Sequence, residues 1–266
     1  MRRLFLPILT YPVPTPGLPL QRALDLAAIL GASVHCAVVE IDIPPLSNPF
    51  PIGIDVVAMA AEAEAVSRRR ATEMRVQVQD QARRGALALD ATRYRSRLEM
   101  VGGILANSAR TYDLTMLCVA DDDEHRNVAE TLMFQSGGPV VLVPALDARV
   151  HLDTVAVAWD GSRAAARAVH DAIPLLAKAE RVVVLTVESD KAIDPFSVDG
   201  VLRLLEAHEV NAIHIDVLMS ASRTVGEALQ GAALEKDAGL LVMGAYGHSR
   251  LREFVLGGAT RSILAN

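Results

Sequence analysis

The residues best suited to chemistry lie in the segment 243–260, where glycines stand in the spacing Gly-x2-Gly-x9-Gly-Gly. The first two, Gly244 and Gly247, end an expected buried strand, and the second two, Gly257 and Gly258, precede an expected helix. A strand end without Cβ atoms lets a ligand come close to the backbone. The free N–H groups at the start of the helix favour an anion there. Glycines that only form turns are the alternative, but a strand–loop–helix junction with this spacing favours a phosphate-binding loop.

The other polar residues do not form a recognisable catalytic set. The seven histidines are scattered and show no HExxH spacing for a metal ion. No Gly-x-Ser-x-Gly motif surrounds Ser162, and there is no Walker lysine. His248 lies inside the glycine-rich segment, so it is the histidine that we expect to contact a ligand. The pattern therefore indicates binding rather than catalysis, with no metal ligands predicted.

The segment 243–260 resembles the nucleotide-binding signature of the universal stress protein family, in which Gly-x2-Gly-x9-Gly is followed by Ser or Thr. The resemblance extends to Trp159-Asp160-Gly161-Ser162 and to Leu185-Thr186-Val187-Glu188. It covers residues 152–266 well and residues 2–144 more loosely. It implies a cytoplasmic stress-response regulatory protein that binds ATP or another adenine nucleotide, and it leaves open whether Mg²⁺ accompanies the nucleotide.

The resemblance also implies a role for each matching residue. Asp160 would contact the adenine or the ribose, and the Val187 backbone would hydrogen-bond the adenine. The rest of the implied site surrounds the ribose and phosphates and comprises Met243, Gly244, Gly247, His248, Gly257, Gly258, Ala259 and Thr260. Gly258 stands where the family has Ser or Thr, which removes one hydroxyl at a cost of about 1 kcal/mol. We therefore expect weaker but retained binding, with Thr260 as a partial substitute.

The elements that position these residues occur twice along the chain. Strand, helix and strand are expected over 4–9, 20–30 and 33–39, and again over 154–159, 164–177 and 181–187. Residues 101–105 and 225–229 then each open a helix that leads into a buried strand. Such alternation predicts right-handed βαβ units and parallel sheets. We predict two domains, at residues 1–146 and 151–266, with a boundary in the irregular segment 144–151.

The family resemblance implies the fold class α/β, with two tandem open parallel five-stranded sheets of order 3-2-1-4-5 and helices on both faces. Ligands bind such sheets beyond the carboxyl ends of the strands, where the strand order reverses. In the second domain this point lies between the strands that end at Asp160 and Gly244. The first copy's final strand, 139–143, aligns with positions beyond Asn266, so the last strand of the second domain is expected to be missing.

The first copy is expected to be degenerate. Alignment places Cys118 opposite Gly244 and Asp121 opposite Gly247, and it places Thr10 opposite Asp160. Four carboxylates in the run 121–124 would repel phosphates. This copy also carries a proline-rich loop at 43–49 and a helix from about Asp55 to Arg84, whose pattern predicts an amphipathic helix with a solvated face. A surface for a protein partner is the alternative interpretation of that face.

Composition excludes other classes of protein. The net charge of −6 argues against a nucleic-acid binder, and no apolar run is long enough for a membrane span. Cys36 and Cys118 lie in apolar strand-like runs, as buried cysteines of a reducing compartment would. Three functions remain open: a nucleotide-binding regulator, a slow nucleotide hydrolase, and a nucleotide-free interaction protein with an unknown protein partner. The two domains are expected to form a pseudo-dimer within the chain, and a homodimer is left open.

Overall fold

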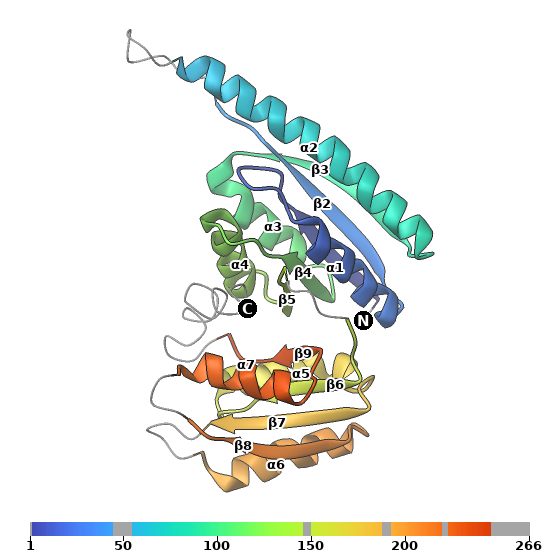
Figure 1. Cartoon of the computed structure of the whole chain (residues 1–266), viewed down its shortest axis with the longest axis vertical. Coiled ribbons are helices and arrows are strands. Elements are labelled where there is room, and N and C mark those ends of the chain that lie inside the picture. Colours follow the sequence, from blue (N-terminus) through green and yellow to red (C-terminus); the bar gives the residue numbers. More distant parts are fainter. Residues whose placement is uncertain (1, 45–54, 146–149, 188–192, 220–222, 246–266) are drawn as a thin grey trace. The chain divides into compact units, whose positions relative to one another are not determined.

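The computed structural model describes residues 2–44, 55–145, 150–187, 193–219 and 223–245. The chain divides into two compact units, Met1–Leu146 and Asp147–Asn266. In each unit strands alternate with helices along the chain, and every strand pair is parallel (Figure 1).

The first unit contains a five-stranded sheet of order β3-β2-β1-β4-β5. Its strands are β1 (Arg3–Ile8), β2 (Ser33–Ile41), β3 (Leu89–Ser96), β4 (Leu114–Cys118) and β5 (Val140–Val143). Its helices are α1 (Gly17–Leu30), α2 (Val56–Arg84), α3 (Val101–Ala109) and α4 (Asp123–Gln135), with a 3-10 turn at Leu98–Met100. The predicted strand order is therefore confirmed in this unit.

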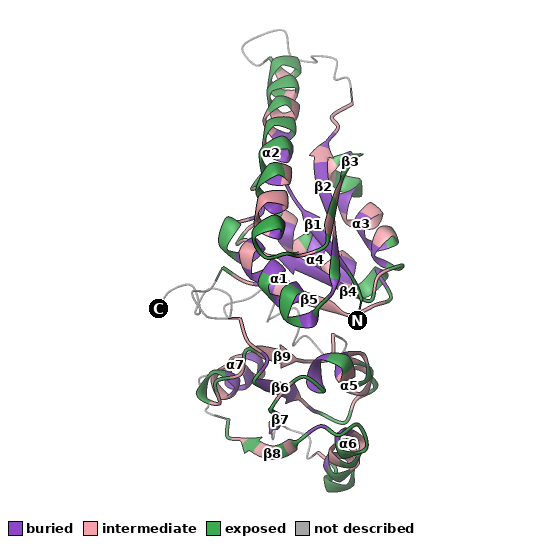
Figure 2. Cartoon of the chain, turned by 90° about the vertical axis from the view of Figure 1, so that its right-hand side faces the viewer, coloured by how far each residue is buried: buried purple, intermediate pink, exposed green. Residues whose placement is uncertain are grey.

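The central strands β1 and β4 are almost wholly buried because helices cover both faces of the sheet. All residues of β1 from Leu4 to Ile8 and all five residues of β4 are buried. Helix α1 contacts α2, and α3 contacts α4. Right-handed crossovers place the first pair on one face of the sheet and the second pair on the other. Figure 2 shows this layering, with buried strands between helices whose outer faces are exposed.

Helix α2 spans 29 residues and confirms the predicted amphipathic helix. The Asp55 side chain caps it by accepting a hydrogen bond from the Ala58 N–H at 2.9 Å. Its buried residues recur every three or four positions, as one helical face requires, and are Ser67, Ala71, Met74, Val78 and Ala82. None of the residues 56–66 is fully buried, so the buried face of α2 begins at Ser67.

The second unit repeats the arrangement with four strands among its described residues, in the order β8-β7-β6-β9. The strands are β6 (Thr154–Ala158), β7 (Arg181–Val187), β8 (Ala212–Val217) and β9 (Leu240–Val242). The helices are α5 (Arg163–Leu176), α6 (Pro195–Ala207) and α7 (Val225–Glu235). This order corresponds to 3-2-1-4 of the predicted sheet. The expected absence of a fifth strand concerns positions outside the described residues.

Two further findings concern the classes of protein considered above. Cys36 and Cys118 are both free and buried, and burial raises the pKa of both thiols. No helix in the part of the chain that the structure describes is long and apolar enough to cross a membrane.

Candidate functional site

The reversal of strand order in the second unit creates a hollow at the carboxyl ends of its strands. Strand β6 is flanked by β7 on one side and by β9 on the other. The residues that line the hollow are Ala158, Trp159, Asp160, Ser162, Ala165, Leu185, Val187, Val225, Gly226, Leu229, Met243 and Gly244. Many of them are small, which leaves room where α5 and α7 meet the strand ends. The hollow lies at the position where open α/β sheets bind ligands.

Four of the site residues predicted from sequence line this hollow together. They are Asp160 after β6, Val187 at the end of β7, and Met243 and Gly244 after β9. The other six predicted residues, Gly247, His248, Gly257, Gly258, Ala259 and Thr260, lie outside the described residues.

Asp160 is exposed at the mouth of the hollow, and its carboxylate has a defined orientation. Its Oδ1 accepts a hydrogen bond from the Ser162 N–H at 3.0 Å. Ser162 is the N-cap of α5, and its hydroxyl accepts from the Ala165 N–H at 3.1 Å. The turn before α5 therefore folds the aspartate back over the helix start, a local arrangement typical of Asp and Ser at N-termini. The anionic side chain is held at the edge of the hollow.

Gly244 has a packing role that sequence reasoning missed. A Cβ added to Gly244 would lie 2.6 Å from both the Ala164 carbonyl carbon and the Ala165 nitrogen. The first turn of α5 therefore passes too close to this strand end for any side chain. The glycine is required by this backbone approach, in addition to the room for a ligand that the motif predicted.

The contribution of α7 to the hollow was also missed. Val225, Gly226 and Leu229 line it from the first turns of this helix. The order of the elements could have predicted this contribution. Helix α7 follows β8 and therefore begins at the carboxyl edge of the sheet, where the predicted site lies. Thr224 caps the helix in a reciprocal arrangement with Glu227. The Glu227 N–H donates to the Thr224 Oγ1 at 3.2 Å, and the Thr224 N–H donates to the Glu227 Oε2 at 2.8 Å.

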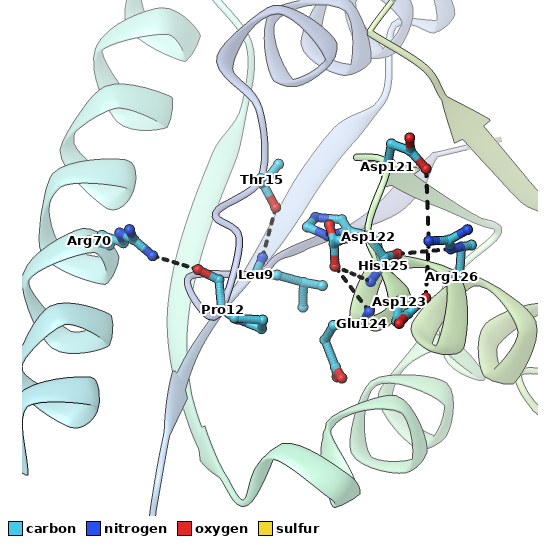
Figure 3. A network of polar contacts seen from close by, with 10 residues as sticks. All are labelled: Leu9, Pro12, Thr15, Arg70, Asp121, Asp122, Asp123, Glu124, His125 and Arg126. Carbon is cyan, nitrogen blue, oxygen red and sulfur yellow. Dashed lines mark hydrogen bonds and ion pairs between the residues drawn. The ribbon is translucent and has the colours of Figure 1, made fainter. Parts of the chain in front are cut away.

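In the first unit, the corresponding position is occupied by protein groups. The Thr10 hydroxyl donates to the Val39 carbonyl oxygen at 2.7 Å, and the Ser67 Oγ lies 2.6 Å from the Thr10 Oγ1. The Ser67 Oγ also accepts the Ile41 N–H at 3.0 Å. Arg70 donates to the Thr10 carbonyl oxygen. It also donates to the Pro12 carbonyl oxygen, as Figure 3 shows, and so holds this loop in place. Helix α2 thus supplies the polar groups that close this end of the sheet.

The strand registers correct one detail of the predicted alignment. Arg3 pairs with Ser33 in the first sheet, and Thr154 pairs with Arg181 in the second. Counting from these pairs places Leu9, rather than Thr10, opposite Asp160. The prediction erred by one residue because the segment after β1, which contains Pro12, Pro14 and Pro16, has no counterpart in the second copy to align with.

The acidic run 121–124 of the first unit is partly neutralised by its own neighbours. Asp122 caps α4, and its Oδ2 lies 2.6 Å from the Nδ1 of the buried His125 (Figure 3). Arg126 reaches Asp123 at 3.0 Å and Asp121 at 3.8 Å. Burial raises the pKa of Glu124, and the nearby Asp122 carboxylate raises it further. These residues serve the helix start, so the prediction that they repel phosphates stays a prediction.

Burial lowers the pKa of His125, although Asp122 acts in the opposite direction. Its side chain has no exposed area, and its Nε2 has no hydrogen-bond partner. The neutral imidazole is therefore the form that this site stabilises. No group of three or more His, Cys, Asp or Glu side chains among the described residues could hold a metal ion.

Comparisons with known proteins find similarity to one protein family. Residues 151–266 match the family model described as Universal stress protein family. A crystal structure of a universal stress protein family member from Burkholderia pseudomallei is 26% identical, with coverage of 39% of this chain and 88% of that chain and a TM-score of 0.31. A protein from Mycobacterium tuberculosis is 24% identical, with coverage of 44% and 91% and a TM-score of 0.28. No curated protein matches the chain.

Proposed function

Since residues 151–266 form a domain of the universal stress protein family, we propose that the chain is a regulatory protein that binds an adenine nucleotide in its second unit. The observation that carries this proposal is the meeting of Asp160, Val187, Met243 and Gly244 around one hollow. These residues come from three strand ends that are far apart in sequence, and the family signature associates all of them with nucleotide.

The lining of the hollow suits a flat base with a polar edge. Leu185, Val187 and Leu229 provide apolar surface, and Asp160 provides a hydrogen-bond acceptor at the mouth. A pocket with mostly apolar walls and a few oriented polar groups is typical of small-molecule sites. Phosphates would extend toward the glycine-rich segment that begins at Gly244.

The test is a titration of the full chain with ATP, in which isothermal calorimetry measures the dissociation constant. Asp160→Ala removes the acceptor at the mouth and should weaken ATP binding by about one to two orders of magnitude, since hydrogen bonds to charged groups contribute about 1.5–3 kcal/mol. Asp153→Ala is the matched control, because Asp153 is also exposed but lies just before the amino end of the same strand. Equal losses in both variants, or no ATP binding by the unmodified chain, would contradict the proposal.

Phosphate release measured in the same samples separates binding from hydrolysis. The proposed function predicts bound ATP without turnover. Turnover that Asp160→Ala abolishes would instead support the slow hydrolase.

A further inference from the structure

Ser197 of helix α6 supports the turn that carries Asp160. Trp159 directly follows β6, and its main-chain N–H donates to the Leu185 carbonyl oxygen at 2.9 Å. Its indole Nε1–H donates to the Ser197 Oγ at 3.1 Å. Trp159 is 9% exposed, and a buried indole N–H needs such a partner. Ser197 therefore satisfies the polar group of a side chain that lines the hollow.

Ser197 also contacts the other neighbour of Asp160. Gly161 adopts φ +72°, and a Cβ added there would lie 3.0 Å from the Ser197 Oγ. The Ser197 hydroxyl thus lies close to Gly161, whose positive φ is a backbone conformation that favours glycine. The Ser197 side chain therefore bonds one of the residues that flank Asp160 and lies beside the other.

Helix α6 keeps Ser197 in place through its own cap. Asp194 is the N-cap residue, and its carboxylate accepts the Phe196 N–H at 3.0 Å. The Ser197 N–H donates to the Asp194 carbonyl oxygen at 2.9 Å. Ser197 does not line the hollow itself, so any influence on a ligand must pass through the turn 159–161.

We propose that Ser197 is a positioning residue of the nucleotide site, which aligns Asp160 by holding the side chain of the adjacent Trp159 through the indole hydrogen bond. This inference rests on the proposed function. The physical reason is that a free carboxylate on an unsupported turn must lose conformational freedom when a ligand binds, whereas a supported turn has already lost it.

The experiment uses the full chain, ATP and the intrinsic fluorescence of Trp159, which is the only tryptophan in the sequence. Ser197→Ala removes the acceptor of the indole N–H. We expect ATP affinity by calorimetry to fall about three- to five-fold, as for the loss of one neutral hydrogen bond. We also expect the emission maximum of the nucleotide-free protein to shift. Asp199→Ala, an exposed change on the same helix, should alter neither quantity.

A double-mutant cycle with Trp159→Phe separates positioning from general damage. Phenylalanine keeps an aromatic ring but has no N–H to donate. In this background Ser197→Ala should leave ATP affinity unchanged, because the contact is already lost. The inference is overturned if Ser197→Ala lowers ATP affinity equally in the unmodified chain and in Trp159→Phe. It is also overturned if Ser197→Ala leaves the ATP affinity of the otherwise unmodified chain unchanged. Absence of ATP binding by the unmodified chain overturns the proposed function instead.

Discussion

Thr10 donates its hydroxyl hydrogen to the Val39 carbonyl oxygen at 2.7 Å, and Val39 holds in the first sheet the position that Val187 holds in the second. Val187 is the residue whose backbone is proposed to meet the adenine. In the first unit this backbone oxygen already has a protein partner. The Ser67 hydroxyl completes the closure by accepting the Ile41 N–H.

Because of this closure, we predict that one chain binds one adenine nucleotide. The fitted stoichiometry of an ATP titration checks this directly. Val225→Trp places a large side chain in the second unit's hollow and should abolish all binding. Retention of one bound nucleotide in that variant would show that the first unit binds as well.

Ser67→Ala should destabilise the first unit. The substitution leaves the Ile41 N–H without its 3.0 Å partner in a buried position, which costs about 1–3 kcal/mol. Hydrogen exchange of the β2 amides would report the loss in this unit alone. Thr72→Ala on the exposed face of α2 is the control, since its hydroxyl only bonds the Arg68 carbonyl oxygen one turn back. A protection loss that is no larger for Ser67→Ala than for the control would contradict the role given to Ser67.

His125 should make the first unit less stable in mild acid. Its folded pKa is lowered from 6.5 by burial, so the folded state favours the neutral ring. The stabilisation is fully present above about pH 6.5 and is lost as the pH falls below that value toward the lower folded pKa. Denaturant unfolding between pH 8 and pH 5 measures it. His125→Asn should flatten this part of the pH profile, whereas His170→Asn, at an exposed site on α5, should leave the profile unchanged.

Gly244→Ala should destabilise the second unit even without a ligand. The added Cβ would meet the backbone of Ala164 and Ala165 at 2.6 Å, and overpacking of this kind costs about 1–3 kcal/mol. Gly200→Ala is the matched control, because Gly200 lies within α6 with nothing near its Cβ position. Alanine there should stabilise the helix by about 0.5–1 kcal/mol. Urea unfolding of both variants gives the comparison, and a neutral Gly244→Ala would remove the packing role.

The order and type of the elements could be predicted because each carries a local pattern. The apolar runs at 181–187 and 114–119 became β7 and β4, and the helix expected from about Asp55 to Arg84 became α2. Small offsets occurred after β1 and at the start of α1, because the prolines between Thr10 and Gly17 offer several possible boundaries. In the second unit, the position of Asp160 and Gly244 at the same hollow followed from the expected strand order, since parallel strands bring their carboxyl ends to one edge.

The sequence by itself determined the alternation of strands and helices, the duplication, and the residue types at the strand ends, because propensity, burial pattern and glycine spacing act over short stretches of chain. Only the tertiary structure decided that the first turn of α5 requires a glycine at 244, that α7 lines the hollow, and that Thr10, Val39 and Ser67 close the first unit. Those contacts join residues 29 and 57 positions apart. Which side chains meet over such separations depends on how helices pack on the sheet, and no local pattern encodes that geometry.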